Sequence, residues 1–144
     1  MWFAGGDAAA IYDRLWATPA LAAIHLANEK GVVVGGASAG AMVWGAGTLT
    51  DFASLGDPEP FSLFGWLDHL VVFAHYWPTR ERALRERLAA FPGCQALGVA
   101  HGGAVVVGPG DQNLQVLDRG VKGTDSILLA GPDQPVTRIR GARP

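Results

Sequence analysis

The 144-residue chain has little of what marks several classes of protein. Cys94 is its only cysteine, so no disulfide can form within the chain and a reduced, cytoplasmic setting is expected. No apolar run approaches the roughly 18 residues that cross a membrane, and no basic segment leads into an apolar stretch as in a signal peptide. A net charge of −2 offers no attraction to nucleic acid or to an anionic membrane. What remains is the composition of a globular domain.

Helix-like and strand-like segments alternate in the first part of the chain, and short strands crowd the last part. Apolar spacing predicts helices, and continuous apolar runs predict buried strands at Val32–Val34 and His69–Ala74. The helices are expected at 8–16, 18–30, 38–46 and 80–90, a loop at 48–61, and short strands at 96–100, 104–107, 114–117 and 127–129. This order predicts one α/β domain over residues 1–144, with a parallel-sheet core, a small β finish and a loose tail at 131–144.

The stretch Gly36-Ala37-Ser38-Ala39-Gly40 has the Gly-x-Ser-x-Gly pattern of a nucleophile elbow. Because the turn is tight, side chains two positions before and after Ser38 would collide with the adjoining strand and helix. The serine hydroxyl would be exposed at a helix N-terminus, where the N–H of Ala39 can stabilise an oxyanion. The alternative is a glycine-rich turn in which Ser38 only caps the helix.

A serine nucleophile needs a base, and His75 fits that role best among the four histidines. It follows a predicted strand at its C-terminal end, where parallel α/β sheets place their sites. The others lie in a helix, at a strand start and at a possible strand end: His25, His69 and His101. The alternative for His75 is a structural histidine at a strand end.

The acid that would orient the base stays open. Four carboxylates lie between the serine and the histidine: Asp51, Asp57, Glu59 and Asp68. Asp51 follows the elbow helix after a short link, so it can return beside the elbow. A solvated loop carboxylate is the alternative for each.

Two segments of the chain resemble peptidase family S51, the group of dipeptidase E and cyanophycinase. The resemblance extends from about Phe3 to Gly123. It is carried by the Gly-Gly turn after the first strand, the Ser-Ala-Gly-Ala elbow and a strand-end histidine before an arginine-rich helix. The spacing of 37 residues from Ser38 to His75 also agrees with the family. In an α/β-hydrolase the serine and the histidine are normally separated by a far longer stretch. The resemblance implies a class I glutamine-amidotransferase-like fold, with three layers and a mostly parallel sheet flanked by helices.

The family's functional residues can be carried over to this chain position by position. The resemblance implies Ser38 as nucleophile, His75 as base, and the N–H groups of Gly6 and Ala39 as oxyanion hole. Asp51 is nearest to the family's acid. Asp57 and Glu59 stay open, because the family varies its third residue between Asp and Glu.

Two departures from the family pattern change what is expected. Family members begin with further β/α units before the Gly-Gly turn, so we expect this chain to lack the N-terminal part of the family domain. Members often carry an acidic residue and a threonine where this chain has His101 followed by Gly102-Gly103. We therefore expect specificity at that position to differ.

Four arginines lie on the helix predicted after the histidine: Arg80, Arg82, Arg85 and Arg87. One interpretation is a solvated face, since Glu81 pairs with Arg85 and Arg82 with Glu86 at i,i+4 spacing. The other is that Arg80 or Arg82 grips a substrate carboxylate with its guanidinium group. Family members use arginines in this segment to hold an aspartyl side chain or a main-chain carboxylate.

The sequence and the resemblance together predict a serine peptidase. Its substrates would be short peptides or isopeptides with an acidic residue, Asp, near the scissile bond, cleaved through an acyl-enzyme. The alternative is a non-catalytic amidotransferase-like module or an inactive fragment. No metal or organic cofactor is predicted, because no cluster of cysteine, histidine and carboxylate residues has ligand spacing. The expected partner is a small peptide, with neither nucleic acid nor membrane; a homodimer, the exact substrate and the exo- or endopeptidase mode stay open.

Overall fold

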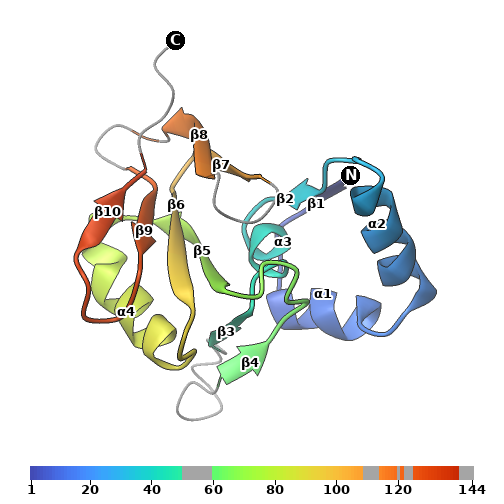
Figure 1. The fold of residues 1–144 in the computed structure, drawn as a ribbon, viewed down its shortest axis with the longest axis horizontal. Helices are drawn as coiled ribbons and strands as arrows, with labels where there is room; N and C mark the ends of the chain where they lie inside the picture. Colours follow the sequence, from blue (N-terminus) through green and yellow to red (C-terminus); the bar gives the residue numbers. More distant parts are fainter. Residues whose placement is uncertain (50–59, 109–113, 120, 122–124, 140–144) are drawn as a thin grey trace.

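The structure, a computed structural model, describes residues 1–49, 60–108, 114–119, 121 and 125–139. Helices and strands are mixed along the chain (Figure 1). In chain order the elements are β1 (Trp2–Phe3), α1 (Ala8–Leu15), α2 (Pro19–Glu29), β2 (Gly35–Gly36), α3 (Ala39–Met42), β3 (Gly47–Leu49), β4 (Pro60–Ser62), β5 (Leu70–Tyr76), the 3₁₀ turn η1 (Pro78–Arg80), α4 (Glu81–Ala89), β6 (Gln95–Ala100), β7 (Gly103–Val107), β8 (Leu114–Arg119), β9 (Ile127–Leu129) and β10 (Val136–Arg138).

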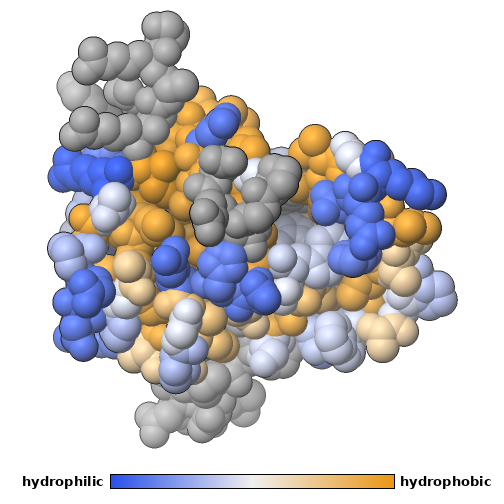
Figure 2. Space-filling model, viewed as in Figure 1, coloured by the Kyte–Doolittle hydropathy of each residue, from blue (hydrophilic) through white to orange (hydrophobic). Residues whose placement is uncertain are grey.

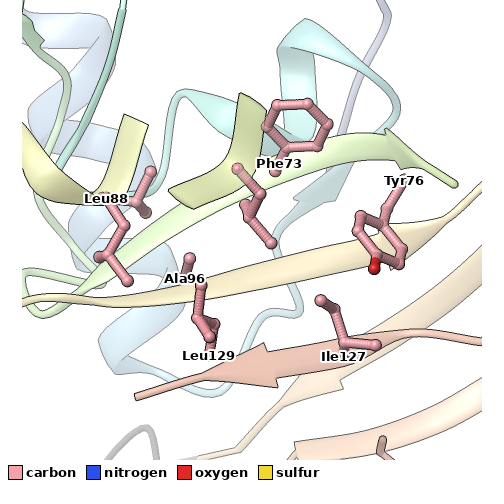
Figure 3. Close-up of a cluster of buried hydrophobic side chains, with 8 residues drawn as sticks. Phe73, Tyr76, Leu88, Ala96, Ile127 and Leu129 are labelled. Atoms are coloured by element: carbon pink, nitrogen blue, oxygen red, sulfur yellow. The ribbon is translucent and has the colours of Figure 1, made fainter. Parts of the chain in front are cut away.

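The sheet with the strand order β10-β9-β6-β5 is the largest in the described part of the chain. Strands β5 and β6 are parallel, and α4 connects them and packs against both (Figure 1). Strand β9 pairs antiparallel with β6, and β10 antiparallel with β9. The main apolar core consists of buried side chains from α4 and this sheet (Figure 3): Val71, Phe73, Tyr76, Leu84, Leu88, Ala96, Ile127 and Leu129.

A second apolar cluster holds the N-terminal helices against the segment that follows α3. Its buried members are Ile24, Val43, Trp44, Leu63 and Phe64. After α3 the chain runs along the edge of β5, where the N–H of Ala46 donates to the carbonyl of Leu70 at 2.8 Å. The N-terminal part and the four-stranded sheet therefore meet at β5.

The α/β class is confirmed, but the described ladders are not those of a mostly parallel, three-layer sheet. Parallel ladders join β1 to β2 and β5 to β6, whereas the other four ladders in the described residues are antiparallel. Links of ten residues or fewer join β3 to β4, β7 to β8 and β9 to β10. Links of that length favour antiparallel pairs, because a parallel pair needs a crossover of roughly a dozen residues or more.

The prediction of a buried strand at Val32–Val34 is wrong. The strand is β2, at Gly35–Gly36, and it pairs with β1. Val33 is 80% exposed, and Trp2 on β1 is 70% exposed. An apolar run reports strand propensity but not whether another layer covers it. Val106 on β7 and Leu117 on β8 are exposed as well. Figure 2 shows hydrophobic surface where these strands lie.

Other elements agree with their sequence signals. The helix expected at 18–30 is α2, in which the hydroxyl of Thr18 accepts the N–H of Leu21 at 3.3 Å and Pro19 occupies the first turn. The strand expected at 69–74 is β5, and most of its side chains are buried. In the described part of the chain, every helix is too short or too polar to cross a bilayer.

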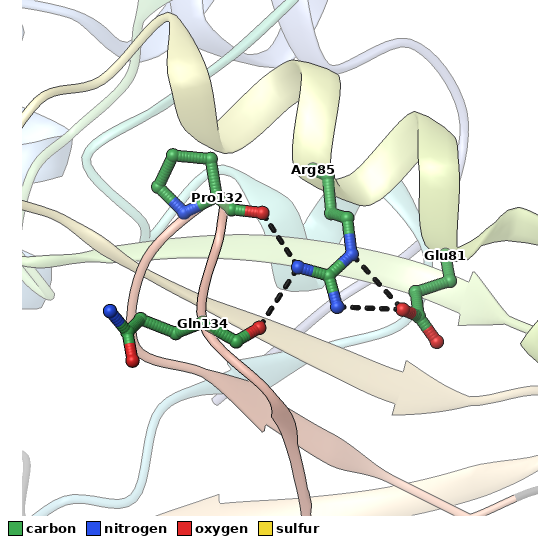
Figure 4. A network of polar contacts seen from close by, with 4 residues as sticks. All are labelled: Glu81, Arg85, Pro132 and Gln134. Carbon is green, nitrogen blue, oxygen red and sulfur yellow. Dashed lines mark hydrogen bonds and ion pairs between the residues drawn. The ribbon is translucent and has the colours of Figure 1, made fainter.

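Arg85 links the C-terminal segment to α4 (Figure 4). Its Nη1 donates to the carbonyl oxygens of Pro132 and Gln134 at 2.6 and 2.9 Å, while Nε and Nη2 donate to the carboxylate of Glu81. Within 131–144, where a loose tail was expected, β10 joins the sheet. The polar composition of this segment suggested a loose tail. Composition does not reveal that the segment pairs with β9 or that Arg85 binds its carbonyl groups.

We expect Leu84→Ala to lower the free energy of unfolding by about 2–5 kcal/mol, because it empties a fully buried position between α4 and the sheet. Leu26→Ala in α2 is the matched control, since its side chain is 51% exposed, and it should change the free energy by about 0.5 kcal/mol at most. Urea denaturation followed by circular dichroism measures both. Equal losses in the two variants would contradict this assignment of the core.

Candidate functional site

Ser38 lies at the turn between β2 and α3, as the elbow pattern predicts. Its backbone has φ 55° and ψ −121°, a conformation that L-residues rarely adopt. Holding such a residue costs about 1–3 kcal/mol, and such strain gathers at functional sites. Within the described residues of α3, the hydroxyl makes no capping hydrogen bond. The alternative in which Ser38 merely caps the helix is therefore not what the geometry shows.

The glycines of the elbow are required by backbone contact. A Cβ on Gly36 would lie 2.1 Å from the carbonyl oxygen of Gly40. A Cβ on Gly40 would lie 2.5 Å from the carbonyl oxygens of Phe3 and Ala4. Real Cβ atoms essentially never come so close to backbone, so the strand, turn and helix can pack this tightly only without side chains there.

The Gly-Gly turn after β1 lies against the elbow. A Cβ on Gly5 would be 3.1 Å from Cβ and 3.7 Å from Oγ of Ser38. Gly6 follows with φ 148°, and Asp7 then caps α1 by accepting two backbone N–H groups. Ala39, buried, opens α3 directly after the serine. The assignment of the Gly6 and Ala39 N–H groups to an oxyanion hole remains a prediction.

His75 lies near the end of β5, at an irregularity in the sheet. The register with β6 shifts between Phe73 and Tyr76, and His75 has φ 55°. Phe73 and Tyr76 are buried, whereas His75 is exposed. A bulge of this kind re-aims one side chain without disturbing the packing of its neighbours. It turns the imidazole of His75 out of the core at the carboxyl end of the strand.

The structure brings His75 together with a residue that the sequence did not pair with it. Nδ1 of His75 lies 3.2 Å from Nδ1 of His101, and the indole of Trp77 stacks on the His101 ring with centroids 5.4 Å apart. His101 directly follows β6. Because β5 and β6 are parallel, their carboxyl ends meet at one edge of the sheet. The position of both histidines at the ends of predicted strands was the sequence signal for this contact.

The candidate acids do not complete a triad in the described residues. Asp51, Asp57 and Glu59 lie outside the part of the chain that the structure describes. Asp68 is exposed and accepts from Nδ1 of its neighbour His69 at 3.1 Å, at the start of β5. That is the opposite end of the strand from His75, so Asp68 does not orient it.

Two arginines of α4 form ion pairs along the helix. The predicted i,i+4 pairs are present, Arg85 with Glu81 at 2.7 Å and Arg82 with Glu86 at 3.4 Å. The side chain of Arg82 is 90% exposed. The guanidinium of Arg80, on η1 just after His75, lies 5.4 Å from the ring centroid of Phe73.

Arg87 is a buried arginine that the sequence did not single out. It is 8% exposed, donates to the hydroxyl of Thr48 at 3.1 Å, and lies 4.8 Å from the ring centroid of Phe73. The sequence around Arg87 does not indicate its burial, because its hydrogen-bond partner Thr48 is 39 residues away along the chain. Arg87 thus links α4 to β3 across β5.

Cys94 and the His, Cys, Asp and Glu side chains of the described residues were the other candidates for chemistry. Burial, and secondarily the carboxylate of Asp68, raises the pKa of the Cys94 thiol, whose Sγ is 3.7 Å from the Asp68 carbonyl oxygen. A raised pKa keeps the thiol protonated at neutral pH, and the thiolate is the nucleophilic form. Among the described residues no three His, Cys, Asp or Glu side chains gather as metal ligands would.

Comparison with known families connects this geometry to a chemistry. The model of peptidase family S51 matches residues 1–115. The match includes the elbow at Ser38, the bulge at His75 and the strand end at His101. No curated protein matches the chain.

We expect Gly36→Ala to lower the free energy of unfolding by about 3 kcal/mol, because the added methyl group would overlap the Gly40 carbonyl. Ala37→Ser, at an exposed position in the same turn, is the control and should change it by about 0.5 kcal/mol at most. Thermal unfolding followed by circular dichroism compares the two. An unchanged melting temperature for Gly36→Ala would refute the close packing at the elbow.

Proposed function

Because the chain belongs to peptidase family S51, we propose that it is a serine peptidase that cleaves short peptides or isopeptides with an aspartyl residue near the scissile bond. The observation that carries the proposal is the strained Ser38 between β2 and α3, with glycines wherever a side chain would collide. The parallel pairs β1–β2 and β5–β6 support the class I glutamine-amidotransferase-like arrangement. The single cysteine supports a cytoplasmic setting.

In the proposed reaction, the hydroxyl oxygen of Ser38 attacks the scissile carbonyl while His75 accepts its proton. The N–H groups of Gly6 and Ala39 would stabilise the oxyanion that forms. His75 then returns the proton to the leaving amine, and an acyl-enzyme on Ser38 remains. Water hydrolyses that ester with His75 again as base. Asp51 is the carboxylate that the family resemblance proposes as third residue, with Asp57 and Glu59 as alternatives.

Of the two arginines proposed to bind the acidic side chain, Arg80 has the better support. It lies five residues after His75, on the turn that continues from the end of β5. Arg82 points into solvent with Glu86 as its partner. A guanidinium at Arg80 could hold a carboxylate by two parallel hydrogen bonds.

We expect the chain to hydrolyse aspartyl dipeptides and chromogenic aspartyl amides, and Ser38→Ala to abolish this activity. Removal of a triad serine lowers kcat by about a million-fold, so the variant should show no turnover above background. Ser62→Ala, at an exposed serine in β4, is the matched control and should retain full activity.

If the folded chain and Ser38→Ala are equally inert on the whole panel, the non-catalytic amidotransferase-like module becomes the better account. Activity that survives in Ser38→Ala at the level of Ser62→Ala would place the nucleophile elsewhere. Circular dichroism spectra of all three proteins check that each is folded.

We expect Arg80→Ala to raise KM for aspartyl substrates by about 10- to 100-fold and to leave kcat nearly unchanged, because a lost carboxylate contact weakens binding before chemistry. The KM of Arg80→Ala for asparaginyl analogues should rise much less. Arg82→Ala tests the second candidate, and Arg14→Ala, at an exposed position of α1, is the matched control. Equal KM values for all three variants would exclude both arginines from selection of the acidic residue.

A further inference from the structure

We propose that His101 is the positioning residue of His75, taking the place that a carboxylate fills in a Ser-His-acid triad; this rests on the proposed function. The observation is the contact between Nδ1 of His75 and Nδ1 of His101 at 3.2 Å. A serine protease base uses one ring nitrogen toward the serine and is held through the other. In this chain the nitrogen that is held faces a second imidazole.

The contact assigns the protons once the chemistry is taken into account. A hydrogen bond between two neutral imidazoles needs a proton on one of the two facing nitrogens only. To accept the proton of Ser38, His75 must have an unprotonated Nε2, so its own proton is on Nδ1. Nδ1 of His101 is therefore the acceptor, and the proton of His101 is on Nε2. The opposite assignment would leave His75 without a free nitrogen for the serine.

The same hydrogen bond persists through the reaction. When Nε2 of His75 takes the serine proton, the ring becomes an imidazolium and Nδ1–H still donates to the lone pair of His101. A neutral ring stabilises that charge less than a carboxylate would, but it holds the tautomer and the ring direction. No proton moves between the two histidines in this scheme.

His101 is held by the residues that follow His75. Its backbone N–H donates to the carbonyl of Tyr76 at 3.1 Å, and its carbonyl accepts from the N–H of Val121 at 2.9 Å. The indole of Trp77 stacks on its ring with 28° between the planes. Since Tyr76 and Trp77 are the next two residues after His75, the two imidazoles are positioned by one short segment.

This proposal replaces the assignment of a carboxylate to the same role, because His101 and Asp51 would use the same nitrogen of His75. Neutral His75 has a single proton on Nδ1, and His101 accepts it in this geometry. Asp51, Asp57 or Glu59 could accept a hydrogen bond from that Nδ1–H only if His101 no longer accepted it. The two accounts therefore predict opposite results when each residue is removed.

The first test reads the tautomers directly and needs no activity. In the folded chain with ring-labelled histidines and both rings neutral, nitrogen NMR should find the His75 proton on Nδ1 and the His101 proton on Nε2. In His101→Phe, the resonance of the His75 Nδ1 proton should lose the signature of a hydrogen bond. A His75 proton on Nε2 in the native chain would overturn the proposal, whether or not the chain is a peptidase.

The second test separates the acceptor from the ring. His101→Phe keeps an aromatic surface for Trp77 but removes the acceptor, and should lower kcat by about 100-fold with KM unchanged. His101→Asn places an amide oxygen near the former Nδ1 and should recover kcat to within about tenfold of the native value. His25→Phe, at an exposed histidine of α2, is the matched control and should have native kinetics.

Each remaining outcome counts for or against His101. If Asp51→Ala, Asp57→Ala or Glu59→Gln abolishes turnover while His101→Phe does not, a carboxylate orients the base and the proposal fails, although the peptidase stands. If His101→Phe and His101→Asn lose kcat equally, the acceptor is not what matters. If no variant and no native chain turns over substrate, the proposed function fails, and the tautomers alone decide whether His101 holds His75.

Discussion

The parallel pairing of β5 with β6 is the constraint on which the rest of the structure depends. The crossover through α4 buries Leu84 and Leu88 against both strands and builds the main core. It also brings the carboxyl ends of the two strands to one edge, so that His75 and His101 meet although 26 residues separate them. The pair of histidines and the main core therefore come from the same βαβ unit, whereas Ser38 lies on the segment that joins β2 to α3.

Strained backbone occurs at two residues that the proposed reaction uses. Ser38 and His75 both have φ 55°; Ser38 lies just after β2 and His75 near the end of β5. Ala17 is the other non-glycine residue with positive φ in the described part of the chain. At Ser38 the strained conformation is held by the close packing of the glycine backbones around it. At His75 it lies in a bulge whose neighbours Phe73 and Tyr76 stay buried. Both arrangements present a polar side chain at the surface of a well-packed element.

Local patterns in the sequence predicted the features that depend on a few consecutive residues. The elbow at Ser38, the helix start at Thr18-Pro19 and the buried strand β5 follow from sterics, capping and apolar runs. Features that depend on a distant partner were missed. Arg87 is buried with Thr48 as a hydrogen-bond partner, and Arg85 holds the carbonyls of Pro132 and Gln134 between β9 and β10. The run at Val32–Val34 looked buried because an apolar pattern cannot tell whether another layer covers it.

By itself the sequence determined the α/β class, the position of the candidate nucleophile and that of its candidate base, because turn sterics and strand ends are local properties. The tertiary structure decided that His101 faces His75, that Asp68 pairs with His69, and that Arg85 and Arg87 serve the fold. It also decided that most described ladders are antiparallel. The reason is the same in each case: strand order and side-chain partners depend on how distant segments pack, and residue types at short spacing carry no record of that packing.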